Sequence, residues 1–331
     1  MKVFVAGATG ALGVPLVRAL VAHGHEVVGM TRTPGKRALL EQMGARAVVA
    51  DALDAKALVQ AVREAAPTHV VHLLTALPKN GPLRPKDVAA TNVLRIQGTA
   101  NLLQAAIAAG VQRIVAESYA YVYGYGDHGP RPLSEDDPPP PRDPERAFQP
   151  ADDALRALEA QVLDANRQGK IEAVVLRYGM LYGPENPGIQ ALLGMLRGRR
   201  LPIVRGAKGL ATFVHEDDAV TAMLAALERG RPGAIYHIVD DEAVGFNTFV
   251  VAAAQAIGAP RPYALPGWLL RLLAPLVVPV ATSRLVLSNA RAKAELGWQP
   301  RFANYRVGLA DLVRRLPAQE SNAGAAARTR A

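Results

Sequence analysis

The chain begins with Met1-Lys2-Val3-Phe4-Val5-Ala6-Gly7-Ala8-Thr9-Gly10-Ala11-Leu12-Gly13, an apolar strand pattern that runs directly into a glycine-rich turn. The glycines permit a tight turn and a close approach of the backbone to a pyrophosphate. The helix predicted from Val14 to His23 presents free N–H groups and a partial positive charge at its N-terminus. Between a strand and a helix, this motif predicts a dinucleotide site, and a glycine turn without a ligand is the weaker alternative. We expect the nucleotide to contact Gly7, Thr9, Gly10, Ala11, Leu12 and Gly13.

Short β-branched runs alternate with alanine- and leucine-rich segments along the first half of the chain. The runs predict buried strands at 3–6, 26–30, 47–50, 69–74, 114–117 and 173–176. The segments between them predict helices at 14–23, 54–65, 88–109 and 152–168. Such alternation is typical of a parallel sheet covered on both faces. The predicted fold class is therefore α/β: a Rossmann-type doubly wound parallel sheet with a smaller C-terminal substrate-binding lobe.

The pattern loosens beyond Met180, where proline and glycine become frequent, and a strand at 234–239 is expected to return to the main sheet. We therefore assign 1–182 and 211–240 to the cofactor-binding domain and 183–210 and 241–316 to the substrate-binding lobe. The polar, alanine-rich end at 317–331 is expected to be a disordered tail. The long loop 124–150, with four consecutive prolines, is interpreted as a lid near the site or as a surface excursion.

Composition excludes several classes of protein. Cysteine is absent from the 331 residues, which excludes disulfides, cysteine nucleophiles and thiolate metal sites. The histidines lack partners at metal-ligand spacing, so no metal is expected. The net charge of +9 is scattered, which argues against nucleic acid as a partner. The glycine loop begins within seven residues of Met1, so no signal peptide is expected. The most apolar segment, 268–287, carries two arginines and two prolines, so no membrane span is expected there. We therefore expect a cytoplasmic protein.

The second strand indicates which nucleotide is bound. It ends in Met30-Thr31-Arg32, without the acidic residue that would hold the ribose hydroxyls of NAD. Arg32 suits a 2′-phosphate, so NADP(H) is the preferred cofactor, with NAD(H) as the second choice and a solvated basic loop as the non-binding alternative. After the third strand, Asp51 and Ala52 lie where the adenine is expected, although Asp51 also suits a helix N-cap.

Further motifs follow in a characteristic order: Val71-His72-Leu73-Leu74, Gly98-Thr99-Ala100-Asn101, Val122-Tyr123-Gly124, Leu176-Arg177-Tyr178-Gly179-Met180, Phe213-Val214-His215 and Glu295-Leu296-Gly297-Trp298. With the glycine loop, they make residues 1–316 resemble the extended short-chain dehydrogenase/reductase superfamily, the NAD(P)-dependent epimerase/dehydratase-like group. The resemblance implies that Leu74 and Thr75 line the adenosine and ribose side and that Tyr178 and Met180 lie near the nicotinamide. A small-molecule substrate is expected, and a homodimer is one option for the oligomeric state.

The chain departs from this family where catalysis is expected. Tyr-x-x-x-Lys is absent, and alignment on Glu159 places Ala151 and Leu155 at the tyrosine and lysine positions. Glu117-Ser118-Tyr119 replaces a run of small hydroxyl residues after the fifth strand. Tyrosines then recur at every second position from 119 to 125, which puts them on one face wherever the backbone is extended. The candidate catalytic residues are Ser118, Tyr119 and Tyr123, with packing or substrate shaping as the alternative role.

The missing pair also narrows the reaction. A tyrosine without a nearby lysine has a pKa of about 10, so it is a poor base but still a hydrogen-bond and proton donor. Reduction requires only such a donor. Ala211 and Thr212 stand where a diphosphate-holding arginine is common, and the apolar 269–280 stretch fits a partly hydrophobic substrate or core packing. We predict an NADP(H)-dependent reductase of a small carbonyl or enone-like metabolite, with a non-redox isomerase, cyclase or lyase, or an NADP(H)-sensing binding protein, as alternatives.

Overall fold

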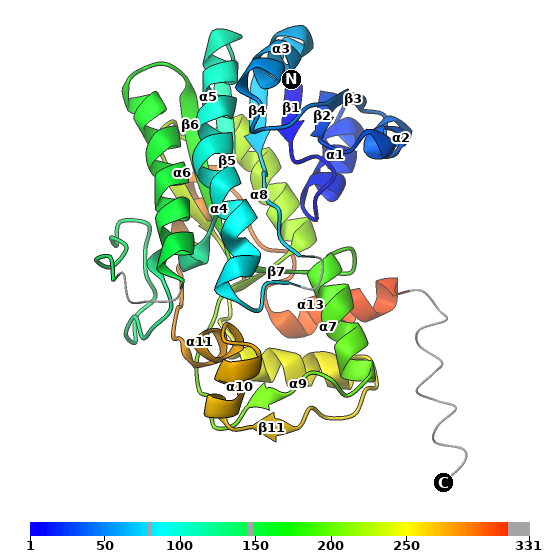
Figure 1. The fold of residues 1–331 in the computed structure, drawn as a ribbon, viewed down its shortest axis with the longest axis vertical. Helices are drawn as coiled ribbons and strands as arrows, with labels where there is room; N and C mark the ends of the chain where they lie inside the picture. Colours follow the sequence, from blue (N-terminus) through cyan, green and yellow to red (C-terminus); the bar gives the residue numbers. More distant parts are fainter. Residues whose placement is uncertain (79–80, 144–147, 317–331) are drawn as a thin grey trace.

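The computed structural model describes residues 1–78, 81–143 and 148–316 and is built around a parallel sheet of seven strands (Figure 1). The strand order is β10-β6-β5-β4-β1-β2-β3, so the order reverses between β1 and β4. The strands are β1 Lys2–Ala6, β2 Glu26–Thr31, β3 Arg46–Val49, β4 His69–His72, β5 Arg113–Tyr119, β6 Glu172–Tyr178 and β10 Ile235–Ile238. The α/β class and the doubly wound parallel sheet are confirmed. The predicted tail, 317–331, and part of the proline-rich loop lie outside the described residues.

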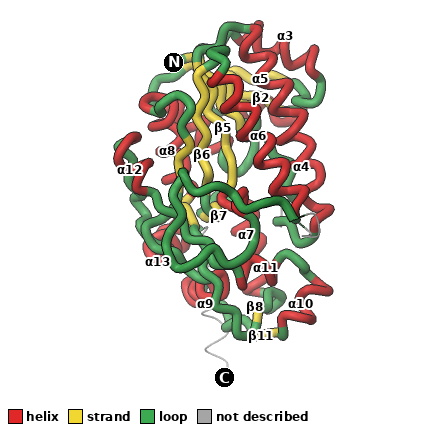
Figure 2. The backbone as a smooth tube through the Cα atoms, turned by 90° about the vertical axis from the view of Figure 1, so that its left-hand side faces the viewer, coloured by secondary structure: helices red, strands yellow, loops and turns green. Residues whose placement is uncertain are grey.

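Helices cover both faces of the sheet, as the buried, largely β-branched strands require (Figures 1 and 2). One face carries α3 Ala55–Ala65, α4 Ala89–Val93, α5 Thr99–Ala108 and α6 Gln149–Arg167. The other face carries α1 Gly13–Ala22, α2 Arg37–Gln42, α8 Glu216–Arg229 and α12 Ala290–Leu296. Alternate strand residues enter the two cores, for example Val3 and Val5 on one side and Phe4 and Ala6 on the other.

The helix predicted at 88–109 is interrupted. Between α4 and α5 the backbone forms a single π-helical turn, Leu94–Gly98, which widens the helix locally. π turns are rare and occur frequently at functional sites. This turn lies at the same end of the sheet as the carboxyl ends of the strands, since α5 runs back from it alongside β4 and β5.

The remaining elements form a smaller lobe below the carboxyl edge of the sheet in Figure 1. Its helices are α7 Pro187–Arg197, α9 Phe246–Ala256, α10 Gly267–Leu273, α11 Val277–Thr282 and α13 Tyr305–Arg315, and its strands are β8 Ile203–Val204 and β11 Ala264–Leu265. A two-stranded sheet of β7 Met180–Tyr182 and β9 Phe213–His215 joins it to the main sheet. Phe213 stacks on Phe249 in the lobe core. By contrast, α12 packs on α8 and β10, so the domain boundaries given above stay a prediction.

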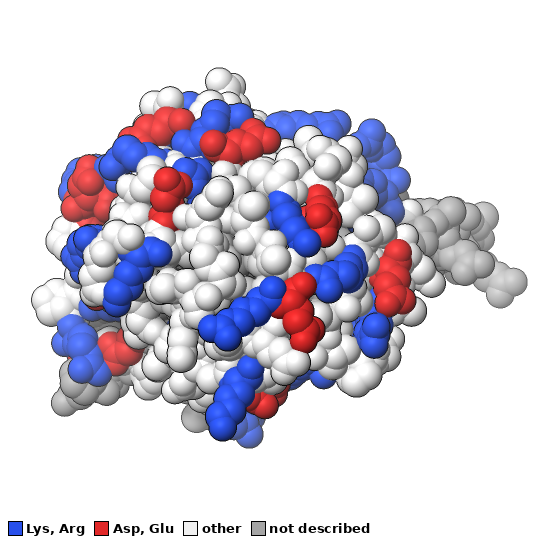
Figure 3. Space-filling view, turned by 90° about the horizontal axis from the view of Figure 1, so that it is seen from above, with Lys and Arg blue, Asp and Glu red and all other residues white. Residues whose placement is uncertain are grey.

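None of the helices in the described part of the chain combines the length and the apolar character needed to cross a bilayer. Over the same residues, no group of three or more histidine and acidic side chains is arranged to hold a metal ion. On the face seen in Figure 3, lysine and arginine side chains are interspersed with aspartate and glutamate.

Candidate functional site

The glycine loop connects β1 to α1 and lies at the carboxyl edge of the sheet, beside the point where the strand order reverses. Gly7 has a φ of +97°, and a Cβ atom there would lie 2.4 Å from the carbonyl oxygen of Leu73. A Cβ atom on Gly13 would lie 2.2 Å from the carbonyl oxygen of Gly7, to which the Gly10 N–H donates at 3.0 Å. Only glycine fits this cradle. In the first turn of α1 the Val14 N–H already donates to the Gly10 carbonyl and Pro15 has no N–H, so the donor left at the helix N-terminus is the Gly13 N–H. The loop therefore has the shape and the donors that a pyrophosphate requires.

The predicted adenosine side of the loop is formed by the ends of β2 and β3. Arg32 follows β2, is exposed, and has no hydrogen bond or ion pair with the described residues. Thr9 approaches β2 through a 3.5 Å contact between its Oγ1 and that of Thr31. The exposed Asp51 accepts from the N–H of Leu53, and the N-cap of α3 is Asp54, so the N-cap alternative for Asp51 is wrong.

The other nucleotide-side residues differ in exposure. Ala52 is buried, and its carbonyl accepts from Asn101 at 2.9 Å. Leu74 is buried behind the loop, and its N–H donates to Nδ1 of His72 at 3.2 Å. Thr75 is exposed, so its hydroxyl is accessible to a ligand at this edge. Ala52 thus follows the carboxyl end of β3, and Leu74 and Thr75 follow that of β4.

Tyr178, the last residue of β6, and Met180, the first residue of β7, have different environments. Tyr178 is fully buried, and its hydroxyl donates to the carbonyl of Ala219 at 3.1 Å, so the side chain belongs to the core. Met180 is half-buried, and its sulfur accepts a hydrogen bond from the hydroxyl of Tyr121 at 3.9 Å. Of the two, only Met180 has a side chain available to the predicted nicotinamide region.

Ser118 and Tyr123 belong to one buried network. The Ser118 hydroxyl donates to Glu159 Oε1 at 2.6 Å. Arg177 donates to both carboxylate oxygens of Glu159 and, at 2.7 Å, to the hydroxyl of Tyr123. The Tyr123 hydroxyl also lies 3.0 Å from Nε2 of His237, and burial raises its pKa to about 12. These contacts occupy both candidate groups with the protein's own residues.

The tyrosines from 119 to 125 do not form an extended ladder. Residues Ala120–Tyr123 form a 3₁₀ turn, which removes the period of two. The rings of Tyr119 and Tyr121 are 5.2 Å apart, those of Tyr121 and Tyr125 are 4.5 Å apart, and Tyr123 points away into its network. Burial raises the pKa of each clustered tyrosine above its ordinary value, so none of them is an effective base at neutral pH.

The structure adds two residues that sequence reasoning did not select, Glu117 and Arg95. Glu117 lies on β5 between the buried Ala116 and Ser118 and faces the same side as Tyr178. Burial raises the pKa of Glu117 to about 7, and the guanidinium of Arg95, on the π turn, opposes that rise. The available signal was an acidic residue at the end of an otherwise apolar strand.

A cavity of about 550 Å³ lies between the tyrosine cluster and the smaller lobe. Its apolar wall includes Tyr125, Phe148, Pro275, Val278 and Pro279, and its polar wall includes Asp127, Arg271 and Ser283. Tyr125 contacts Phe148 edge to face at 5.5 Å and connects the cavity to the end of β5 through Tyr121. Parts of the 269–280 stretch therefore line this cavity, while Leu270 and Val278 also pack in the lobe core.

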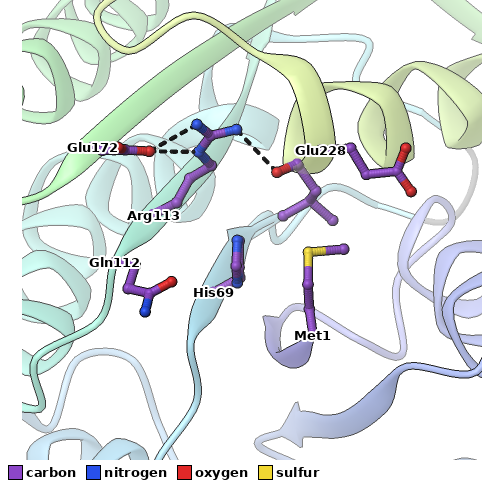
Figure 4. Close-up of a pocket in the computed structure, with 7 residues that line it drawn as sticks. Met1, His69, Gln112, Arg113, Glu172 and Glu228 are labelled. Atoms are coloured by element: carbon purple, nitrogen blue, oxygen red, sulfur yellow. Dashed lines mark hydrogen bonds and ion pairs between the residues drawn. The ribbon is translucent and has the colours of Figure 1, made fainter.

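A second cavity lies at the opposite, amino edge of the sheet (Figure 4). It is lined by Met1, His69 and Arg113, and Arg113 is bound to Glu172 and to carbonyl groups at the end of α8. Ligands of open parallel sheets bind outside the carboxyl ends of the strands. The candidate site is therefore the carboxyl edge, from the glycine loop to the tyrosine-lined cavity.

Comparison with known proteins agrees with this geometry. The model of the NAD dependent epimerase/dehydratase family matches residues 3–239. The chain belongs to this family. A 3-diazoavenalumate denitrifying reductase of a Streptomyces species is 39% identical over 313 residues, covering 93% of this chain and 99% of that protein. The 2-alkyl-3-oxoalkanoate reductase of Stenotrophomonas maltophilia is 30% identical and covers 79% and 77% of the two chains.

Solved structures support the same assignment. MoeE5 in complex with UDP-glucose and NAD has a TM-score of 0.76 and 28% identity, covering 95% of this chain and 98% of that one. The chain is thus an oxidoreductase-type enzyme of the extended short-chain dehydrogenase/reductase superfamily, and the glycine cradle fits the NAD(P) that its family binds.

Proposed function

We propose that this family member is an NADP(H)-dependent reductase of a small, partly hydrophobic acceptor. The observation that carries the proposal is the loss of the tyrosine–lysine pair: the aligned positions in α6 hold Ala151 and the buried Leu155. The clustered tyrosines are buried with raised pKa values, so they do not replace the missing base. Oxidation of an alcohol requires a base, whereas reduction requires a hydride and an acid.

The chain's own residues hold the cofactor. The glycine loop and the N-terminus of α1 bind the pyrophosphate, and Arg32, free of internal partners, binds the 2′-phosphate that distinguishes NADP(H) from NAD(H). Asp51 and Ala52 flank the adenine, and Thr75 reaches the ribose. When bound, the reduced nicotinamide supplies the hydride.

The acceptor occupies the cavity lined by Tyr125 and Phe148, whose mixed walls favour a partly apolar molecule over a nucleotide sugar. A carbonyl or enone-like metabolite fits, and a relative named as an oxoalkanoate reductase supports this class. A diazo acid is the second acceptor class, because the relative at 39% identity is named as a denitrifying reductase of a diazo compound. Either acceptor consumes one hydride and one proton and requires no base.

The direct test is NADPH consumption by purified protein with a panel of carbonyl, enone and diazo acids, followed by the absorbance of the reduced nicotinamide. Acceptor-dependent oxidation of NADPH, with loss of N₂ for a diazo substrate, is expected. Turnover without net cofactor change would instead identify an isomerase, cyclase or lyase. Tight NADPH binding without any turnover would identify a sensing protein. The cytoplasmic location and a homodimer remain further proposals from the sequence.

A further inference from the structure

The end of β5 occupies the nicotinamide half of the site. A dinucleotide binds across the crevice where the strand order reverses, here between β1 and β4, with one mononucleotide half on each side. The glycine loop and Arg32 take the pyrophosphate and the adenosine half over β1, β2 and β3. The remaining half extends over β4, β5 and β6, which places the nicotinamide end beside the last residues of β5, Glu117 to Tyr119.

The carboxyl group of Glu117 has no partner among the described residues. Its neighbours Ala116 and Ser118 face one side of the sheet, where Ala116 packs in the core and the Ser118 hydroxyl is bound to Glu159. Glu117 points to the other side, pairs with Leu176 across β6, and is half-buried. Its carboxyl group makes no hydrogen bond and no ion pair with the described residues. Buried polar groups normally have a partner, so this carboxyl group is free to bind a ligand at this edge of the sheet.

Among the described residues, the groups that interact electrostatically with Glu117 are Arg95 on the π turn and Tyr178 on β6. Arg95 interacts in the same way with Tyr119 and Tyr125, on the segment that follows β5. The Arg95 guanidinium is half-buried and makes no hydrogen bond with the described residues. Burial lowers the pKa of Arg95 and raises that of Glu117, and each charge offsets the shift of the other.

We propose that Glu117 is the acid that replaces the missing tyrosine–lysine pair. This rests on the proposed function, because it names the proton donor of the same reduction. With a carbonyl acceptor, hydride from the reduced nicotinamide attaches to carbon, the π pair moves to oxygen, and Glu117 gives that oxygen its proton. With a neutral diazo acceptor, Glu117 first protonates the diazo carbon, which gives a diazonium ion. Hydride then attaches to the same carbon while N₂ leaves with the electron pair of the C–N bond. In both cases NADPH becomes NADP⁺, and the Glu117 carboxylate regains a proton from water.

Arg95 lies on the π turn between α4 and α5. Its positive charge opposes the rise that burial causes in the pKa of Glu117, which is about 7. A pKa near neutral is in the range in which a general acid is most effective.

The test compares Glu117→Gln with the matched control Glu216→Gln. Glu216 is also buried, and burial also raises its pKa to about 7, but it lies at the start of α8 and accepts from the N–H of Glu185. Single-turnover hydride transfer from NADPH is measured from pH 5 to pH 9 with the best acceptor. In the wild type and the control, the rate falls as pH rises through the pKa of the acid. In Glu117→Gln the rate drops about 100-fold and loses this pH dependence, with NADPH affinity unchanged.

A second variant keeps Glu117 in place. Arg95→Met removes the charge that lowers the carboxyl's pKa, so the fall in rate moves to higher pH. An unchanged rate and pH profile in Glu117→Gln would overturn the inference while leaving the reductase intact. An unchanged profile in Arg95→Met would overturn the role of Arg95. A wild type that oxidises no NADPH with any acceptor of the panel would overturn the proposed function itself.

Discussion

Replacing Glu159 by glutamine should destabilise the protein strongly, because Glu159 is the centre of its buried polar network. Its side chain is 7% exposed and that of its partner Arg177 is 4% exposed. Glu159 receives two hydrogen bonds from Arg177, at 2.9 Å and 2.7 Å, and one from Ser118 at 2.6 Å. Removing one partner of a buried ion pair leaves the other charge uncompensated and destabilises by about 3–5 kcal/mol. We expect the free energy of unfolding of Glu159→Gln to fall by about that amount.

The assay is urea unfolding at neutral pH, with the slope of the transition checked so that a change in midpoint reports stability. The matched control is Glu185→Gln, which removes the carboxylate of an exposed ion pair with Arg18. Exposed pairs contribute about 0–1 kcal/mol, so the control should unfold close to the wild type. Equal unfolding of Glu159→Gln and Glu185→Gln would refute the reasoning. It would mean that the network is hydrated and that Ser118 is available to a substrate.

Three further outcomes are expected. Gly13→Ala should abolish NADPH binding in a fluorescence titration, because the new Cβ atom would lie 2.2 Å from the Gly7 carbonyl oxygen, and binding with unchanged affinity would contradict this. Tyr125→Ala should raise the KM for the acceptor about tenfold or more with little effect on NADPH affinity, since this ring lines the 550 Å³ cavity; an unchanged KM would place the acceptor elsewhere. Burial raises the pKa of Asp240 to about 8, so the folded protein keeps a proton that the unfolded chain releases at about pH 4. The free energy of unfolding therefore falls as the pH rises from about 4 to about 8. Asp240→Asn should therefore stabilise the protein more at pH 8 than at pH 5 in thermal unfolding, and equal effects at both pH values would refute the shift.

Local patterns predicted the fold and the cofactor side of the site well. The glycine loop, the β-branched runs and the amphipathic segments act over a few residues, so the seven strands and the order of elements follow from the sequence. Arg32 and Asp51 could be placed because each lies within two residues of the end of a strand that is fixed in the parallel sheet. The roles of these residues toward a nucleotide stay predictions.

The catalytic side could not be predicted in the same way, because it depends on contacts between distant elements. The partners of Ser118 and Tyr123 come from α6, β6 and β10, and no local pattern reveals that these contacts occupy the two hydroxyl groups. The 3₁₀ turn at 120–123 cancelled the expected period of two, since tertiary packing of the rings decides the local backbone there. Likewise, the π turn that contains Arg95 is invisible in a continuous helical pattern.

The proposed reduction depends on binding of NADP(H) as the hydride donor, and a nucleotide titration measures this binding. Purified wild-type protein and the Arg32→Asp variant are titrated with NADPH and with NADH, and binding is followed by nicotinamide fluorescence. We expect the wild type to prefer NADPH and Arg32→Asp to lose this preference, because the exposed guanidinium is free to pair with the 2′-phosphate. Equal binding of both nucleotides by the wild type would contradict the cofactor preference, and no binding of either at millimolar concentration would contradict the reductase itself.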